Sequence, residues 1–154
     1  MRKLFGAALL VYFAAIALLF EILPKYDVYM SAPLDTVRVT SEYGYRWGRL
    51  HKGVDLAADR GDAVYSVCGG TVAKAESAGS FGRLVEVVFN ENITVYYAHL
   101  DSIDVTKGVQ VARGQIIGRA GSSGNATGPH LHLEIRYSGK AKNPAQFIDK
   151  IGGV

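Results

Sequence analysis

Cysteine is nearly absent from this chain of 154 residues, which contains Cys68 alone. A single cysteine permits no internal disulfide, and it excludes a structural zinc site of the kind that is built from several thiolates. Cys68 directly follows the apolar, strand-like run AVYSV at residues 63–67. We therefore predict that Cys68 is a small buried hydrophobic residue and not a nucleophile.

A strong excess of charge is lacking as well. The chain carries 17 basic and 14 acidic residues, which gives a formal net charge of +3. The basic residues are scattered and form no stripe with aromatic residues between them. Binding to a nucleic acid depends on such a basic surface, so we expect no nucleic-acid partner.

Only one long hydrophobic run is present, and it lies at the N-terminus. Residues 4–20 carry no charge, and residues 21–23 extend the run to Pro24. A helix over residues 4–23 would be about 30 Å long, which is the thickness of a bilayer core. The apolar region of a signal peptide is shorter and ends at a small-residue cleavage site. We therefore predict an uncleaved transmembrane helix at residues 4–23, in contact with the lipid bilayer.

The charges that flank this run predict its orientation. Arg2 and Lys3 precede it, and positive residues favour the cytoplasmic side of a membrane. We expect residues 1–23 to form a cytoplasmic tip and a single-pass anchor in the inner (cytoplasmic) membrane of a bacterium, with the rest of the chain in the periplasm or at the cell surface. The alternatives are a cleaved signal with a secreted domain, or an anchor in a virion-associated membrane.

Beyond the anchor, the pattern predicts one domain. Residues 24–35 contain two prolines and no clear period, which is typical of a linker. Residues 36–150 consist of short runs rich in Val, Ile and Tyr, separated by Gly, Asn, Asp or Ser. Apart from one short turn near residues 145–151, no stretch has the apolar spacing of a helix. We predict an all-β fold, mainly an antiparallel sheet or sandwich, with residues 151–154 as a tail.

Histidine is also scarce, yet two of the four histidines lie one residue apart in TGPHLHLEIR, residues 127–136. Successive side chains of a strand point to opposite faces of its sheet. The leucine and isoleucine residues of this run then share one face, which we expect to be the core. The opposite face carries His130, His132 and Glu134.

The other two histidines lie beside or within strand-like runs. His51 opens HKGVD, four residues before Asp55, and His99 lies near the end of ITVYYAHL. Imidazole nitrogens and carboxylate oxygens are normal zinc ligands, and a catalytic zinc needs three of them from the protein. Three histidines and Asp55 would therefore suffice, with a histidine left for acid–base work. Each motif alone is weak evidence, and the HExxH zinc signature is absent.

Taken together and in order, these motifs resemble the M23 peptidase family, the lysostaphin-type or LytM-type zinc metallopeptidases that cut peptidoglycan peptides. The resemblance covers nearly all of residues 36–150. It rests on the segments VTSEYGYR, HKGVDLAA, GGTV, YYAHL, VQVARGQIIGRAGSSGNATGPHLHLEI and NPAQFI. It implies a LytM-type β fold with one Zn²⁺ per chain that hydrolyses peptide cross-links of bacterial peptidoglycan. An outward-facing anchor favours the D-alanyl to diamino acid bond over glycine-containing bridges.

The resemblance also implies a role for each site residue. The metal ligands are His51, Asp55 and His132. The catalytic residues are His99 and His130, of which either one takes the proton of the zinc-activated water while the other stabilises the developing oxyanion. Glu134 either orients an imidazole through a hydrogen bond or is a solvated carboxylate at the strand end.

Aromatic residues near the motifs are candidates for a substrate groove. Only WGRL separates YGYR from His51, whereas many relatives carry a longer loop there, so the rim of the groove is expected to be more open. The candidates are Tyr43, Tyr45, Trp47 and Tyr97. Ordinary packing within the sheet is an equally good explanation for each of them.

Two other functions compete with that of a peptidase. Family members that have lost ligands act as catalytically silent peptidoglycan-binding or amidase-regulating modules, but all five expected site residues are present here. The segments GGTV and VQVARGQIIG also resemble a lipoyl or biotinyl carrier module. That module needs an exposed lysine in an M-K-M or D-K-A tripeptide, which the chain lacks, and it leaves the histidines without a role.

Overall fold

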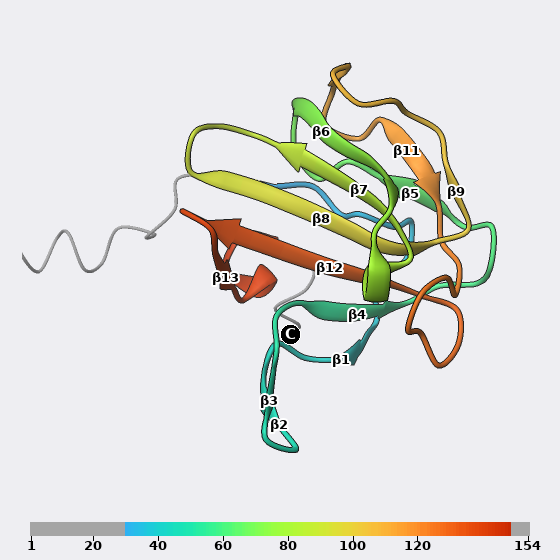
Figure 1. Cartoon of the computed structure of the whole chain (residues 1–154), viewed down its shortest axis with the longest axis vertical. Coiled ribbons are helices and arrows are strands. Elements are labelled where there is room, and N and C mark those ends of the chain that lie inside the picture. Colours follow the sequence, from blue (N-terminus) through green and yellow to red (C-terminus); the bar gives the residue numbers. More distant parts are fainter. Residues whose placement is uncertain (1–29, 149–154) are drawn as a thin grey trace, which may run out of the picture.

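The structure of the protein, a computed structural model, describes residues 30–148. Antiparallel strands form almost all of its regular secondary structure (Figure 1). The largest sheet has eight strands in the order β1-β4-β12-β8-β7-β6-β10, with β13 beside β12. Its strands are β1 (Val39–Ser41), β4 (Val54–Ala57), β6 (Gly70–Ser77), β7 (Arg83–Val88), β8 (Ile93–Leu100), β10 (Gln110–Val111), β12 (His130–Tyr137) and β13 (Lys140–Lys142). Every pair is antiparallel, so the predicted all-β antiparallel fold is confirmed.

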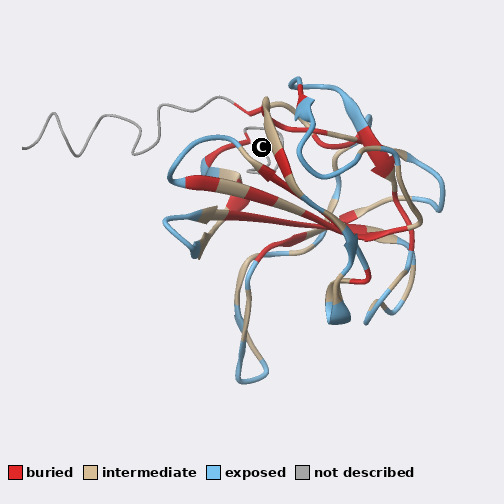
Figure 2. Cartoon of the chain, turned by 45° about the horizontal axis from the view of Figure 1, so that its top comes forward, coloured by how far each residue is buried: buried red, intermediate tan, exposed pale blue. Residues whose placement is uncertain are grey.

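Two smaller sheets and two 3-10 turns complete the described part of the chain. A three-stranded sheet contains β5 (Ala63–Tyr65), β9 (Ser102–Ile103) and β11 (Ile116–Arg119). A separate hairpin consists of β2 (Gly44–Arg46) and β3 (Arg49–His51), and it extends away from the body of the domain (Figures 1 and 2). The 3-10 turns are η1 (Gly79–Phe81) and η2 (Pro144–Gln146), and η2 overlaps the start of the short helical turn predicted near residues 145–151.

The hydrophobic core joins the large sheet to the three-stranded sheet. The alternating residues Leu131, Leu133 and Ile135 of β12 are fully buried in it, as predicted. Val64 of β5 and Ile117 of β11 belong to the same cluster. The core therefore occupies one face of the large sheet, and the polar residues of β12 and β8 are left for the opposite face.

Tyr97 lies in this core, so its prediction as a groove residue was wrong. Its side chain is 0% exposed, and its hydroxyl accepts a hydrogen bond from the backbone N–H of Val67 at 2.8 Å. Side chains alternate along β8, so Tyr97 points into the core with Val95, while Tyr96 points to the opposite face. The two adjacent tyrosines are chemically alike, and only the register of the strand separates them.

The predicted linker is partly folded into the domain. Met30 and Leu34 are 1% and 4% exposed and belong to the core cluster. The backbone N–H of Ser31 donates to the carbonyl of Val67 at 2.9 Å, and the N–H of Tyr65 donates to the carbonyl of Pro33 at 2.9 Å. The domain therefore begins no later than Met30.

The predicted membrane anchor at residues 4–23 and the tail at residues 151–154 lie outside the described residues. Within residues 30–148, no helix has the length and apolar character needed to cross a bilayer.

Burial of Cys68 leads to a testable prediction. Its side chain is 2% exposed, as predicted, and burial raises the pKa of its thiol from 9.0 to about 12. We expect a thiol-reactive dye to label Cys68 only after the protein unfolds. Because the thiol of the unfolded chain ionises at its ordinary pKa, stability falls as the pH rises above about 9. Relative to Cys68→Ala, the wild-type protein should lose about 1 kcal/mol of unfolding free energy between pH 8 and pH 10. Equal slopes for the two proteins would contradict this expectation.

Candidate metal centre

Three predicted metal ligands converge on one point of the polar face. The Oδ1 atom of Asp55 lies 2.7 Å from His132 Nδ1 and 3.2 Å from His51 Nε2. The two imidazole nitrogens are themselves 3.2 Å apart. Among residues 30–148, His51, Asp55 and His132 form the group of side chains whose donor atoms lie close enough together to bind one metal ion.

The register of the sheet accounts for two of the three positions. Asp55 of β4 lies directly opposite His132 of β12 in the antiparallel ladder. Directly opposite residues place their side chains on the same face, a few ångströms apart. His51 ends the β2–β3 hairpin just before β4 begins, so the short connection returns its imidazole to Asp55.

Gly53 makes this connection possible. A Cβ atom on Gly53 would lie 2.3 Å from the backbone oxygen of Leu133 and 2.9 Å from the carbon that bears it. No side chain fits there, because the chain between His51 and Asp55 passes directly against the backbone of β12. The glycine of HKGVD is therefore required by the close approach that brings both ligands together.

Hydrogen bonds fix which imidazole nitrogens are available to a metal. His51 Nδ1 donates to the carbonyl oxygen of Glu42 at 2.7 Å, which leaves Nε2 as the atom that faces Asp55. His132 Nε2 donates to Glu134 Oε1 at 3.3 Å, which leaves Nδ1 facing Asp55. In neutral imidazoles, the lone pairs of these two nitrogens then point toward the carboxylate.

This arrangement favours a positive charge at the point of convergence. Burial opposes ionisation of Asp55, but hydrogen bonds from His132 and His51 outweigh it and hold the pKa of Asp55 far below its ordinary range. Burial likewise opposes protonation of His132, but Asp55 and Glu134 outweigh it and raise the pKa of His132 to about 9. Without a metal, protons supply the charge that the three donors need.

The donor set fits a zinc ion. Zinc–nitrogen and zinc–oxygen bonds of about 2.1 Å in a tetrahedron place neighbouring ligand atoms about 3.4 Å apart. The observed separations of 2.7 to 3.2 Å are slightly shorter. Two imidazoles and one carboxylate are a normal donor set for a catalytic zinc with an open position.

Glu134 contacts His132 instead of lying in solvent. It is 2% exposed, and Arg136 holds its Oε2 atom with two contacts of 2.9 and 2.6 Å. Burial raises the pKa of Glu134, but the hydrogen bonds from His132 and Arg136 outweigh this effect and lower it. The guanidinium of Arg136 also lies over the ring of Tyr96, 4.1 Å from its centroid. Glu134 therefore stays ionised and orients the imidazole of His132.

The two remaining histidines flank the convergence point. The ring centroids of His99 and His130 are 4.8 Å apart, and His130 Nε2 lies 3.8 Å from Asp55 Oδ1. Each ring donates from Nδ1 to a backbone carbonyl at 2.8 Å, His99 to Ser123 and His130 to Gly128. The Nε2 atom of each neutral ring is therefore the one that can accept a proton. Burial lowers the pKa of His99, with smaller contributions from His130 and His132.

A break in the strand alternation brings His99 to this face. Regular alternation would place its side chain in the core with that of Tyr97. Instead, the backbone of His99 has a φ of 61°, and the β7–β8 register shifts between Arg83 and Val85. This β-bulge turns the imidazole of His99 toward His130. A positive φ is uncommon for a residue other than glycine, so the surrounding structure holds His99 in place.

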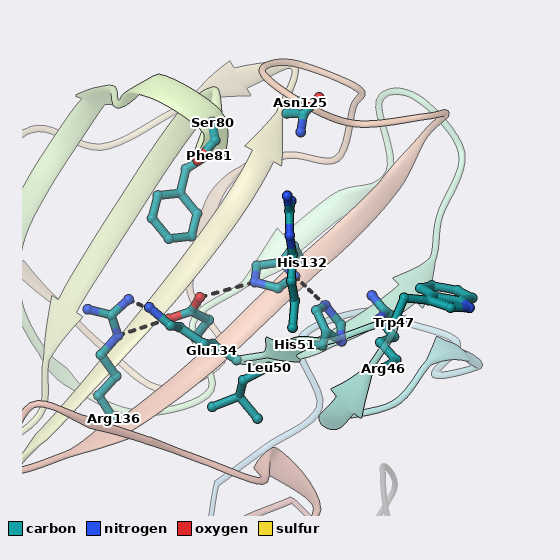
Figure 3. A pocket seen from close by; sticks show the side chains of 12 residues that line it. Arg46, Trp47, Leu50, His51, Ser80, Phe81, Asn125, His132, Glu134 and Arg136 are labelled. Atoms are coloured by element: carbon teal, nitrogen blue, oxygen red, sulfur yellow. Dashed lines mark hydrogen bonds and ion pairs between the residues drawn. The ribbon is translucent and has the colours of Figure 1, made fainter.

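The five residues lie along a groove with two adjoining parts of about 810 and 330 Å³. Both parts share His51, His132 and Phe81, so the convergence point lies where they meet. Figure 3 shows the larger part, with Arg136 on one side of the imidazoles and Arg46 with Trp47 on the other. The smaller part contains His99 and His130.

Two loops supply a wall of the groove that the sequence did not predict. Ser80 and Phe81 come from η1, and Asn125 and Thr127 come from the segment before β12. The backbone N–H of Asn125 donates to the carbonyl of Ser80 at 2.9 Å. Gly82 and Gly124 permit this contact, because a Cβ on either would lie within 2.4 Å of the other loop. In the sequence, the glycines of AGSSGNATG indicate a tight loop, but they do not show which other loop it contacts.

The aromatic residues that were candidates for the substrate groove lie in different places. Trp47 lines the larger part, although it is 93% exposed at the hairpin turn. Tyr45 is 82% exposed and does not line either part of the groove. Tyr43 is half-buried against the core, and its hydroxyl donates to the carbonyl of Ala141 at 3.2 Å. Of the four candidates, the structure therefore places only Trp47 at the groove.

A cluster of two imidazoles and a carboxylate with histidines beside it, at the floor of an open groove, is typical of a mononuclear metallohydrolase. Residues 49–144 match the sequence profile of Peptidase family M23. The chain belongs to this family.

Three similar proteins illustrate the range of the family. The DD-carboxypeptidase/endopeptidase Mpg of Neisseria meningitidis is 37% identical over 119 residues, which cover 73% of this chain and 27% of that protein. The murein hydrolase activator NlpD of Salmonella dublin is 35% identical over 99 residues, which cover 64% and 26%. The crystal structure of a zinc-containing peptidase from Vibrio cholerae has a TM-score of 0.71 and 34% identity, and the match covers 75% of this chain and 39% of that one. The chain thus spans about a quarter of the length of these two curated relatives.

The contact between Glu134 and His132 predicts a change in metal affinity. Glu134→Gln replaces a charged acceptor with a neutral amide, so His132 loses part of its orientation and its negative partner. We expect zinc to bind about 10- to 100-fold more weakly, as measured by competition with a chromogenic chelator. Glu86→Gln is the matched control, because Glu86 lies on the same sheet and pairs with Lys74 instead of a histidine. Equal affinities for the two variants would show that Glu134 does not support the site.

Proposed function

We propose that this domain is a zinc metalloendopeptidase that hydrolyses peptide cross-links of bacterial peptidoglycan. The observation that carries the proposal is the completeness of the site. Three metal donors converge within 3.2 Å of one another. Two further histidines face the same groove with their Nδ1 atoms already engaged. A binding module needs no such set of oriented proton carriers.

The residues support a division of labour around the metal. His51, Asp55 and His132 would hold the ion, which would supply Lewis acidity for activating water and polarising the scissile carbonyl. The Nε2 atoms of His99 and His130 are free to take up a proton from the attacking water and to return one to the leaving amine. Burial lowers the pKa of His99, which favours the neutral imidazole that can accept a proton.

The substrate and the location are part of the same proposal. We propose the D-alanyl to diamino acid bond as the scissile bond. Similarity to a DD-carboxypeptidase/endopeptidase supports an activity on D-amino acid peptides. The uncharged run at residues 4–20 supports an anchor in the inner membrane, with the domain in the periplasm, where peptidoglycan is accessible.

A catalytically silent regulatory module is the second candidate, because the chain is also similar to a murein hydrolase activator. Such a module would bind peptidoglycan or an amidase without turnover. The two functions differ in whether the protein itself breaks bonds.

Digestion of purified sacculi distinguishes these functions. We expect the full chain, in detergent and loaded with zinc, to convert cross-linked dimers into monomers with new D-alanyl carboxyl ends, as identified by mass spectrometry. A chelator should abolish the conversion, and added zinc should restore it. Intact cross-links, together with sedimentation of the protein on the sacculi, would instead favour the binding module.

Two histidine substitutions test the assigned roles. His132→Ala removes a metal donor, so zinc and activity should be lost together. His99→Ala removes a proton carrier that does not touch the convergence point, so the variant should retain most of its zinc while the rate falls about 100-fold or more. Zinc content is measured by atomic absorption beside the sacculus assay. Equal loss of zinc in the two variants would refute the assignment of His99.

A further inference from the structure

The larger part of the groove has an excess of positive charge. Its lining includes the four cationic residues Arg46, Arg49, Lys52 and Arg136. Glu134 is the one carboxylate in that lining. Figure 3 shows Arg46 and Arg136 on opposite sides of the imidazoles of His51 and His132. The cations therefore lie around the metal ligands.

Only part of this charge is neutralised within the described part of the chain. Glu134 is buried and already engaged by Arg136 and His132. Arg46 comes no closer than 3.7 Å to Asp55, its ion-pair partner. Arg49 and Lys52 are exposed, and neither forms an ion pair with any residue from 30 to 148. At least Arg49 and Lys52 are available to a ligand.

The hairpin even places like charges side by side. Arg46 and Arg49 lie directly opposite each other across the β2–β3 ladder, around the turn at Trp47 and Gly48. Directly opposite residues share a face of the hairpin, and like charges in such a pair repel each other. Such a pair lowers the stability of the hairpin. An anionic ligand between the two guanidinium groups would relieve that repulsion.

A carboxylate is the anion that suits this surface. Guanidinium groups bind carboxylates through paired hydrogen bonds, and a concave surface of one sign concentrates ligands of the opposite sign. Peptidoglycan cross-links differ in whether a carboxylate lies beside the scissile amide. In some cross-links, the amide nitrogen is attached to a carbon of the diamino acid that also bears a carboxylate, so a negative charge lies next to the scissile amide. When that carboxylate is amidated, or when the cross-link is a glycine bridge, this negative charge is absent.

We propose that Arg46, Arg49 and Lys52 form a subsite for a free carboxylate next to the scissile amide. The subsite selects cross-links made through a carboxylate-bearing carbon over amidated or glycine cross-links. This inference rests on the proposed function, because it names the substrate class of the same groove.

Two synthetic cross-linked peptides test the inference. They are identical except that one has the free carboxylate beside the D-alanyl amide and the other has a carboxamide. Binding of each to the full chain in detergent is measured by fluorescence anisotropy after treatment with a chelator, so that no hydrolysis occurs. Hydrolysis is then measured with zinc. The proteins are the wild type, the double variant Arg49→Gln/Lys52→Gln, and Lys107→Gln, which removes an exposed cation outside the groove lining.

We expect the wild type and Lys107→Gln to bind the free carboxylate about tenfold more tightly than the carboxamide, since two exposed cations together contribute about this much. The preference should fall as salt is raised from 0.05 to about 0.5 M, because exposed charges are screened. The double variant should lose most of this preference and keep only the part that Arg46 contributes. Because both substituted residues are exposed, and Arg49→Gln relieves the repulsion with Arg46, the variant should keep its fold, as checked by circular dichroism.

The outcomes separate this inference from the proposed function. Equal binding of the two peptides by the wild type would overturn the subsite, even if both were hydrolysed. A carboxylate preference as large in the double variant as in the wild type would overturn the assignment to Arg49 and Lys52. A carboxylate preference in binding without hydrolysis of either peptide would uphold the subsite and refute the endopeptidase.

Discussion

The site depends on one electrostatic constraint, which is that three electron-rich donors share one point. His51 Nε2, His132 Nδ1 and Asp55 Oδ1 all lie within 3.2 Å of one another on the polar face of the large sheet. Such a group is unfavourable unless a positive charge joins it, either as protons or as a metal ion. The raised pKa of His132 and the lowered pKa of Asp55 are two expressions of this need.

The surrounding structure holds the donors together against their repulsion. The antiparallel ladder sets Asp55 opposite His132, and Gly53 lets the chain pass the backbone of β12 closely enough to return His51 to the same point. Hydrogen bonds to Glu42 and Glu134 fix the orientation of the two imidazoles. Because the core fills the other face of the sheet, these strands cannot shift without exposing Leu131, Leu133 and their neighbours.

The same sheet separates two kinds of chemistry along the groove. His99 and His130 lie in the smaller part, where burial lowers the pKa of His99 and a hydrogen bond from its Nδ1 to the Ser123 carbonyl leaves Nε2 able to take up a proton. Arg49 and Lys52 lie in the larger part, where an anionic substrate would be attracted. A peptide that crosses the convergence point would contact both. The placement of proton carriers and cations around the metal donors is what links the fold to the proposed hydrolytic function.

The sequence by itself determined the all-β class, the buried cysteine, the two faces of β12 and the ligand motifs, because these follow from local alternation and from residue chemistry. It did not determine that Tyr97 is in the core, since a tyrosine suits either face of β8 and the strand register decides. Nor did it show that Met30 and Leu34 pack into the domain, or that Ser80 and Asn125 meet at one wall. The bulge that turns His99 into the groove also depends on pairing with β7. All of these are contacts between residues far apart in the chain, and only the tertiary structure brings them together.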